Sequence, residues 1–336
     1  MIEFKLILGR SDIKIESSDD MEKFIEMIKY GIDNNEPIEY FYEIYKDCWH
    51  LVRWNAMSLE NEMFYRARTL NKDDLFHNIN ELKYPPSSIV LEKGRLNDIN
   101  ESVAYLSTSE LVPIVELDIG YYQIYCLVEI EYIEKNIIFF SIGIKGEYEG
   151  LTEAEIKFID FFNHLLTTPN KNYYNATIAF AKKLFKSGLF MNEVKLNQGI
   201  IYNSAQEHKA NKHLYNAVVE PKVFDECFRI KKATYQILSY NALEDCIITN
   251  EINHGEILDN GEINWEKNYE EMIKYCMDLY KDHIFKMNNN ENQSFIVKYP
   301  EGTKFIENED EDYYYIKINE ELVMKVEKAN VIDVVN

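Results

Sequence analysis

The spacing of apolar residues predicts helices in several parts of the chain. Within residues 151–166, apolar side chains recur every three or four positions, and Thr152 with Glu155 fits the capping box that begins many helices. Asp19 or Asp20 can cap another helix over the following residues. A segment that contains Pro113, residues 107–117, is expected to be a short helix or extended. The longer predicted helices cover residues 21–32, 39–54, 151–166, 175–188 and 268–285.

Alternating and β-rich patterns predict strands between and after these helices. The stretch MFYRART, residues 63–69, alternates in the manner of a strand, so Arg66 and Arg68 project from the same face. Pro85 and Pro86 then predict a turn, because proline fits neither a helix interior nor a central strand. Further strands are predicted at the start of the chain and at residues 101–107, 121–133, 199–204, 293–300, 301–308, 311–319 and 321–328.

This irregular mixture of helices and strands predicts an α+β fold rather than a doubly wound sheet. A length of 336 residues allows two domains, or one domain with extensions. We expect a mostly helical N-terminal extension over residues 1–61, a central domain over residues 62–240, and a C-terminal helix with a β-rich segment over residues 241–336.

The chain is acidic, with 36 Lys and Arg against 58 Asp and Glu and a formal net charge of -22. Such a surface repels a phosphate backbone, so direct binding of nucleic acid is not expected. The 5 cysteines contain no CxxC pair, which favours a reducing, cytoplasmic compartment over a disulfide framework. No apolar run reaches the roughly 18 residues of a membrane span, so no membrane association is expected.

The motifs of several common enzyme classes are absent from the sequence. There is no GxxxxGK[ST], no GxGxxG after a strand, no HExxH and no GxSxG. His208 and His213 are not spaced to share one helical face, and the acidic run at residues 307–312 lacks the glycine of a calcium loop. We therefore expect neither a metal site nor a bound cofactor.

Several polar residues instead stand in segments that should form the core of the central domain. Arginine can clamp a pyrophosphate, tyrosine can stack on a flat ring, and a carboxylate can stabilise the oxocarbenium-like state of N-glycosidic cleavage. A simpler interpretation is a structural ion pair between Arg66 and Glu116, with Tyr105 in the core. The set comprises Arg66, Arg68, Gly94, Arg95, Asn97, Tyr105, Ser107, Glu116 and Ser204.

The order of these residues resembles the RES domain, a family named after characteristic Arg, Glu and Ser residues. FYRAR, a proline turn, GRLN, AYLSTSELVPIVEL and GIIYNS follow one another over roughly residues 62–240. Where the family often continues its Gly-Arg-x-Asn element with prolines and a glycine, this chain reads GRLNDINES. The matching residues are Arg66, Glu116 and Ser204, with Gly94, Arg95 and Asn97 at the Gly-Arg-x-Asn element and Tyr105 at the strand tyrosine.

The resemblance implies an ADP-ribosyltransferase-like split mixed sheet with flanking helices. It also implies a toxin that degrades NAD+, as a glycohydrolase or as a phosphorylase that uses inorganic phosphate, in a toxin–antitoxin or phage-defence system. An Xre-like antitoxin is then the expected protein partner, and a homo-oligomer is left open. Two alternatives also remain open: transfer of ADP-ribose to a protein, and a non-catalytic nucleotide-sensing interaction module.

The same resemblance gives each residue an expected role. Glu116, Arg66 and Tyr105 are the expected catalytic residues: Glu116 stabilises the oxocarbenium ion, Arg66 holds the substrate, and Tyr105 stacks on nicotinamide. Arg95 is a second phosphate ligand, and Ser204 orients Glu116 or the ribose. The remaining substrate-binding residues are Arg68, which extends the clamp or pairs with a carboxylate, and Asn97 and Ser107.

Overall fold

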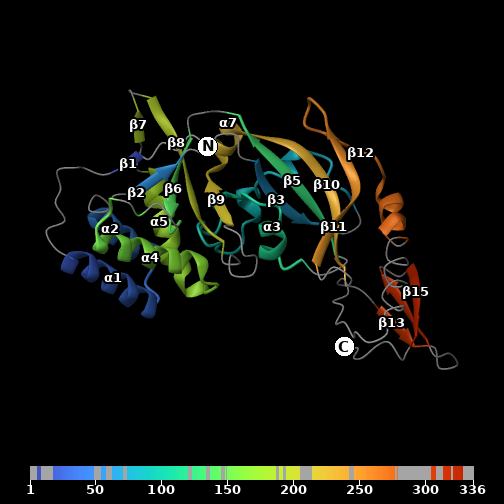
Figure 1. The fold of residues 1–336 in the computed structure, drawn as a ribbon, viewed down its shortest axis with the longest axis horizontal. Helices are drawn as coiled ribbons and strands as arrows, with labels where there is room; N and C mark the ends of the chain where they lie inside the picture. The colour runs from blue at the N-terminus through green and yellow to red at the C-terminus, as the bar shows by residue number, and fades with distance from the viewer. Residues whose placement is uncertain are drawn as a thin grey trace. The chain divides into compact units, whose positions relative to one another are not determined.

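The structure, a computed structural model, describes residues 6–8, 18–48, 54–57, 63–70, 74–119, 123–133, 137–144, 148, 150–186, 189–191, 194–204, 214–241, 246–276, 278, 304–307, 313–318 and 321–327. The chain divides into two compact units. Figure 1 shows the ribbon coloured by residue number. The first comprises Met1–Arg66, Asn80–Glu116 and Glu129–Lys231; the second comprises Ala67–Ile79, Leu117–Val128 and Lys232–Asn336. The fold is α+β with an open, mostly antiparallel sheet, which confirms the predicted class.

The first unit is a twisted sheet with helices packed against it. Within the sheet β6 and β8 are parallel, and the pairs that build the site are antiparallel. Its strands follow the order β1 (Leu6–Leu8), β2 (Trp54–Met57), β6 (Ile137–Ile142), β8 (Val194–Asn203), β9 (Tyr215–Val219), β4 (Ala104–Ser107) and β3 (Met63–Thr69), and β7 (Leu189–Met191) pairs with β8. Its helices are α1 (Ser18–Asp33), α2 (Ile38–Cys48), α3 (Leu111–Glu116), α4 (Glu153–Thr167), α5 (Tyr174–Lys186) and α7 (Pro221–Cys227), with 3-10 turns at η2 (Ile79–Glu81), η3 (Ser87–Ile89) and η4 (Lys171–Tyr173).

Local sequence signals account for the start of two helices. The capping box of α4 is present: Thr152 Oγ1 accepts a hydrogen bond from Glu155 N at 3.3 Å, and Glu155 Oε2 accepts one from Thr152 N at 2.8 Å. Helix α3 contains Pro113 in its first turn, where a backbone N–H has no acceptor within the helix. The short helix expected around Pro113 therefore forms and places Glu116 at its end.

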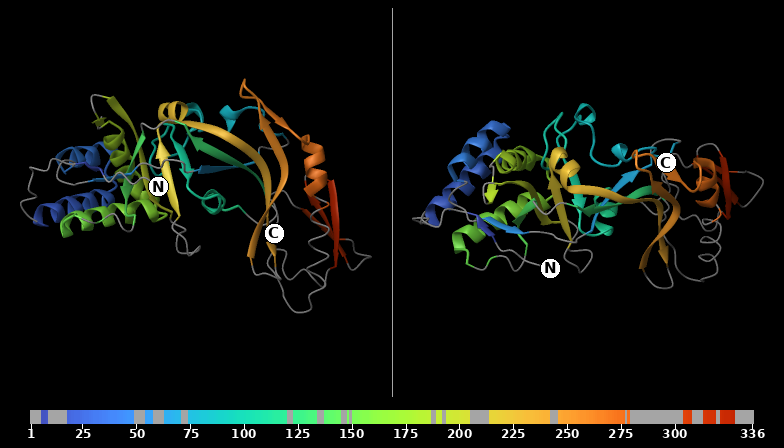
Figure 2. Two further views of the ribbon diagram at one scale, coloured as in Figure 1. Left: turned by 45° about the horizontal axis from the view of Figure 1, so that its top comes forward. Right: turned by 90° about the horizontal axis from the view of Figure 1, so that it is seen from above.

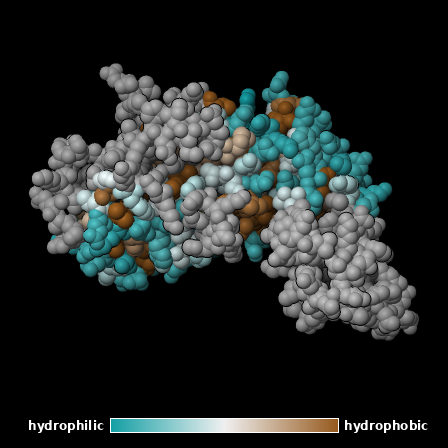
Figure 3. Space-filling model, in the orientation of Figure 1, coloured by the Kyte–Doolittle hydropathy of each residue, from teal (hydrophilic) through white to brown (hydrophobic). Residues whose placement is uncertain are grey.

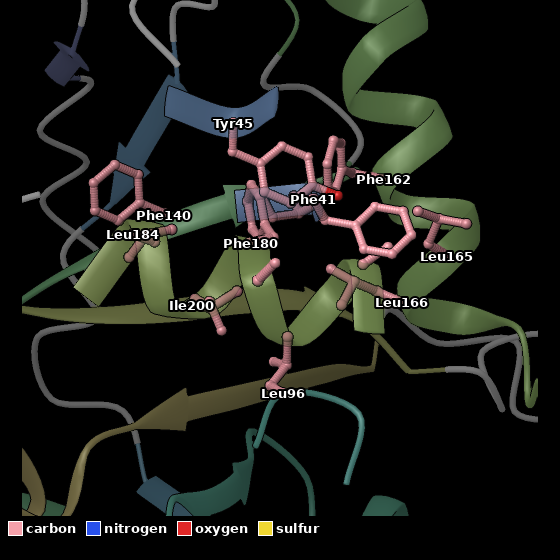
Figure 4. Close-up of a cluster of buried hydrophobic side chains, with 14 of the residues drawn as sticks. Phe41, Tyr45, Leu96, Phe140, Phe162, Leu165, Leu166, Phe180, Leu184 and Ile200 are labelled. Atoms are coloured by element: carbon pink, nitrogen blue, oxygen red, sulfur yellow. The ribbon is translucent and has the colours of Figure 1, made fainter. Parts of the chain in front are cut away.

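An aromatic cluster forms the core of the first unit. The ring centroid of Phe162 lies 4.5 Å from that of Phe180 and 5.4 Å from that of Tyr45 (Figure 4). The Phe158 centroid lies 5.1 Å from that of Phe162. Helices α1 and α2 pack with α4 and α5 in this layer (Figure 2). The segment predicted as an N-terminal extension thus supplies part of this core, and the visible outer side of the layer is mostly hydrophilic (Figure 3).

The predicted helix over residues 39–54 is wrong at its C-terminal end. Helix α2 ends at Cys48, and Trp54 begins β2, where it pairs with Leu8 of β1. Trp54 is buried, with its ring 5.3 Å from that of Phe180. Strand pairing and aromatic packing therefore decide the conformation of Trp54, although the spacing of apolar residues up to this position predicts a helix.

The second unit contains a sheet and a separate three-stranded meander. The sheet follows the order β5 (Ile124–Tyr132), β10 (Phe228–Asn241), β11 (Cys246–Ile257) and β12 (Ile263–Trp265). The unit boundary falls within β3, β5 and β10. Phe76 N donates a hydrogen bond to Tyr235 Oη at 2.8 Å, and Trp265 Nε1 donates one to Phe76 O at 2.6 Å.

The C-terminal predictions are confirmed where the structure describes them. Residues 269–276 are helical, and three antiparallel strands follow. The predicted strand at 293–300 and residues 279–285 of the predicted helix lie outside the described residues. Within the described part of the chain, no helix combines the length and apolarity needed to cross a membrane. The three strands are β13 (Lys304–Glu307), β14 (Tyr313–Ile318) and β15 (Glu321–Glu327).

Candidate functional site

Glu116 is an exposed carboxylate that is held at one of its two oxygens. Its Oε1 accepts a hydrogen bond from Ser204 Oγ at 3.1 Å and another from Asn216 Nδ2 at 3.0 Å. Both donors are buried, with exposed fractions of 2% for Ser204 and 7% for Asn216, whereas Glu116 itself is exposed. The carboxylate is therefore anchored from the protein side while its side chain remains accessible.

Three adjacent strands position the donors. In the antiparallel pairing of β8 with β9, Tyr202 lies opposite Asn216, and in the pairing of β4 with β9, Ser107 lies opposite the same Asn216. Ser204 follows β8, and its N–H donates to Leu214 O at 2.7 Å. Directly opposed residues project from the same face of a sheet, so Ser107, Asn216 and Tyr202 form a row on that face.

The loop that carries Arg95 is fixed by its own hydrogen bonds. Gly94 N donates to Asn97 O at 2.9 Å, and Tyr105 Oη accepts from Leu96 N at 2.8 Å and donates to Asn97 Oδ1 at 3.0 Å. Leu96 is buried in the core cluster (Figure 4). A Cβ on Gly94 would lie 2.2 Å from Asn97 Oδ1, so only glycine fits this loop as it stands.

The Glu116 carboxylate acts electrostatically on Arg95. Burial by itself would lower the pKa of Arg95, but Tyr202, which hydrogen-bonds Arg95 and is ionised only in the alkaline range where Arg95 titrates, raises that pKa above its ordinary value together with Glu116 and Tyr174. Burial raises the pKa of Tyr202 to about 12, against the opposing effect of Arg95. Tyr202 is thus neutral at physiological pH, and Arg95 supplies a permanent positive charge near an anchored carboxylate.

The other predicted polar side chains of the first unit bond mainly to the backbone. Burial raises the pKa of Tyr105, whose hydroxyl holds the Arg95 loop; its ring is half-buried, and stacking on nicotinamide stays a prediction. Asn97 Nδ2 donates to Glu101 O at 3.2 Å. Ser107 Oγ lies within hydrogen-bond distance of Ser109 O, at 2.8 Å, and Tyr65 O, at 3.3 Å. Direct contact of these side chains with a substrate also stays a prediction.

The two arginines of MFYRART have different surroundings. Arg66 belongs to the first unit, and its Nη1 donates to Tyr105 O at 2.8 Å. Arg68 belongs to the second unit, where burial lowers its pKa and the buried thiol of Cys126 has a smaller, opposing effect. Among the described residues, none accepts a hydrogen bond from Arg68 Nε.

Sequence reasoning missed two residues of this network, Asn216 and Tyr202. The signal for Asn216 was present in the run YNAVV, because asparagine is disfavoured in strands and a buried amide must find partners. Tyr202 lies two positions before Ser204 in GIIYNS, but it is not among the site residues predicted from the sequence. Their link to Glu116 depends on the strand register, which residue spacing does not reveal.

Comparison of the chain with known protein families, curated proteins and solved structures finds no match.

Proposed function

We propose that this protein cleaves the N-glycosidic bond between nicotinamide and ribose in NAD+, on an ADP-ribosyltransferase-like sheet, and acts as an NAD+-degrading toxin. One observation carries the proposal: the exposed Glu116 carboxylate is held at Oε1 by two buried donors, Ser204 and Asn216, and its charge raises the pKa of Arg95. This pairing of an anchored anion with an arginine suits a substrate that has a cationic leaving group and an anionic diphosphate. The RES-domain resemblance suggests the particular substrate.

The proposed reaction needs little from the protein beyond placement of charge. When the N-glycosidic bond breaks, its electron pair stays on the pyridine nitrogen, and nicotinamide leaves as a neutral molecule. The ribosyl C1 becomes an oxocarbenium-like cation, which a carboxylate oxygen of Glu116 stabilises. Water then adds to C1 and releases one proton, giving ADP-ribose, or inorganic phosphate adds and gives the 1″-phosphate.

Arg95 is the arginine best suited to hold the diphosphate. Its loop is anchored by Tyr105 and by Thr177, whose Oγ1 donates to Arg95 O at 2.5 Å. These bonds fix the backbone from which the guanidinium projects, so less freedom is lost when the loop binds a phosphate, and bidentate bonding adds geometric selectivity. The stronger role first predicted for Arg66 stays a prediction, because its observed bond is to the Tyr105 carbonyl.

The test is direct measurement of the reaction with the full chain. Purified protein is incubated with NAD+, with and without inorganic phosphate, and the products are identified by mass. Glu116→Gln should lower kcat by about 100-fold or more with little change in KM, since the lost interaction acts mainly in the transition state. Glu110→Gln, an exposed residue just before α3, is the matched control and should keep wild-type kinetics.

Each product distinguishes one version of the proposal. ADP-ribose with nicotinamide indicates a glycohydrolase, and the phosphorylated product, formed only with phosphate, indicates a phosphorylase. Labelling of an added protein extract from radioactive NAD+ would indicate transfer to a protein instead. If no nicotinamide is released under any of these conditions, the proposal is refuted; an unchanged kcat in Glu116→Gln would remove Glu116 from the mechanism.

A further inference from the structure

Among the described residues, the two side chains that donate a hydrogen bond to Glu116 share one carboxylate oxygen. Ser204 and Asn216 each donate to Oε1, from distances of 3.1 Å and 3.0 Å. We propose that Asn216 is a positioning residue that fixes the direction of the Glu116 carboxylate, so that Oε2 is the oxygen presented to the ribosyl cation. The catalytic meaning of this inference rests on the proposed function, whereas the positioning itself does not.

Asn216 can set a direction because its own position is fixed by neighbours on both sides. It lies in β9 between β4 and β8, opposite Ser107 on one side and Tyr202 on the other. Asn216 is a buried residue, with an exposed fraction of 7%, so its Nδ2 donor has few alternatives to Glu116. Ser204 lies beyond the end of β8, and a hydroxyl can rotate about its bond. The amide is therefore the more rigid of the two anchors.

The chemistry of an amide also suits this position. A lysine or arginine bonded directly to Oε1 would offset the negative charge that the ribosyl cation requires. Asn216 and Ser204 are neutral donors, so they orient the carboxylate and leave most of its charge available. Among the described residues of other elements, the Glu116 charge raises the pKa of Arg95 and of Tyr202, and Tyr202 stays neutral at physiological pH because its pKa is about 12.

Two variants of Asn216 test the inference through kinetics. Asn216→Leu removes the donor at similar volume and should lower kcat by about 10-fold or more, with KM changed by less than about 2-fold. Asn216→Asp puts a second carboxylate against Glu116 at neutral pH. As pH falls from about 8 to about 5.5, the two carboxylates take up one shared proton, and the resulting O–H can donate again. The ratio of Asn216→Asp to wild-type activity should therefore rise as the pH is lowered.

A buried asparagine outside the site supplies the matched control. Asn253 has an exposed fraction of 1%, and its Nδ2 donates to Lys267 O at 2.8 Å in the second unit. Asn253→Leu and Asn253→Asp should lower the melting temperature but leave kcat and the pH dependence of the activity ratio unchanged. A purely structural role for Asn216 would make its variants behave like these controls, and that result would overturn the inference.

A double-mutant cycle on unfolding separates this inference from the proposed function. The combined effect of Glu116→Ala and Asn216→Leu on the unfolding equilibrium constant should be about fivefold smaller than the product of the two single effects, because both variants remove the same bond. If wild type releases no nicotinamide but the cycle shows this coupling, the proposed function falls and the positioning stands. If wild type is active and the cycle shows no coupling, the positioning is refuted and the function stands.

Discussion

Replacing Gly94 with alanine tests the construction of the Arg95 loop. A Cβ at this position would lie 2.2 Å from Asn97 Oδ1 and 3.1 Å from both Asn97 Cγ and Tyr105 Oη. The Asn97 side chain must therefore move. It would then lose the hydrogen bond from Tyr105 Oη, now 3.0 Å, and its own bond to Glu101 O, now 3.2 Å. The substitution thus acts on the hydrogen bonds that fix the loop.

The expected cost follows from these bonds. Each contributes about 1 kcal/mol to the free energy of unfolding, and leaving buried partners unpaired adds about 1 kcal/mol more. Alanine also restricts the unfolded chain, which returns about 0.5 kcal/mol. Gly94→Ala should therefore lower the free energy of unfolding by about 2.5 kcal/mol. Displacement of Arg95 should also lower the proposed NAD+ cleavage by about 10-fold or more.

Urea unfolding followed by fluorescence measures the change in the free energy of unfolding. The decisive comparison is between Gly94→Ala in the wild-type protein and Gly94→Ala in an Asn97→Ala variant. In that background the overlapping Oδ1 and Cγ atoms are absent, so Gly94→Ala should change the free energy of unfolding by less than about 1 kcal/mol. The reasoning is refuted if Gly94→Ala is neutral in the wild-type background. An equal cost in both backgrounds would also refute it, because the cost could not then come from Asn97.

Two further predictions concern charged and titratable groups outside the anchored carboxylate. Arg68→Met should raise the free energy of unfolding, measured in urea, by about 1 kcal/mol, because it removes a half-buried charge whose Nε has no acceptor among the described residues. The control Arg229→Met, at an exposed ion pair with Glu131, should change the free energy of unfolding by less than about 0.5 kcal/mol. A clear loss of stability in Arg68→Met would contradict this prediction. Burial and the 2.6 Å hydrogen bond to Asp225 raise the pKa of Tyr84 in the folded protein from 10.0 to about 12. The contribution of this shift to the free energy of unfolding is fully present below pH 10.0 and is lost as the pH rises through about 12. The difference in melting temperature between wild type and Tyr84→Phe should shrink over that interval, and a constant difference would exclude the linkage.

The candidate site could be predicted only in part. Glu116 and Ser204 were expected to act together from the RES-domain resemblance, and the structure contains a hydrogen bond between their side chains. Stacking of Tyr105 on nicotinamide stays a prediction, and the structure adds that its hydroxyl holds the Arg95 loop. Nothing in the spacing of residues could assign that bond, because it depends on the path of the loop rather than on the pattern of the strand.

The sequence by itself determined the features that depend on neighbouring residues. The capping box of Thr152 and Glu155 begins α4, because its hydrogen bonds close within three residues. The strand character of MFYRART likewise follows from its local alternation. Such signals need no knowledge of distant parts of the chain.

The tertiary structure alone decided which distant residues meet. Asn216 reaches Glu116 across 100 positions of sequence, through the register of β4, β9 and β8. Trp54 becomes part of a strand because β1 offers it a partner. Register is fixed by hydrogen-bond ladders and by burial of one face of the sheet, and both arise only when separate segments assemble.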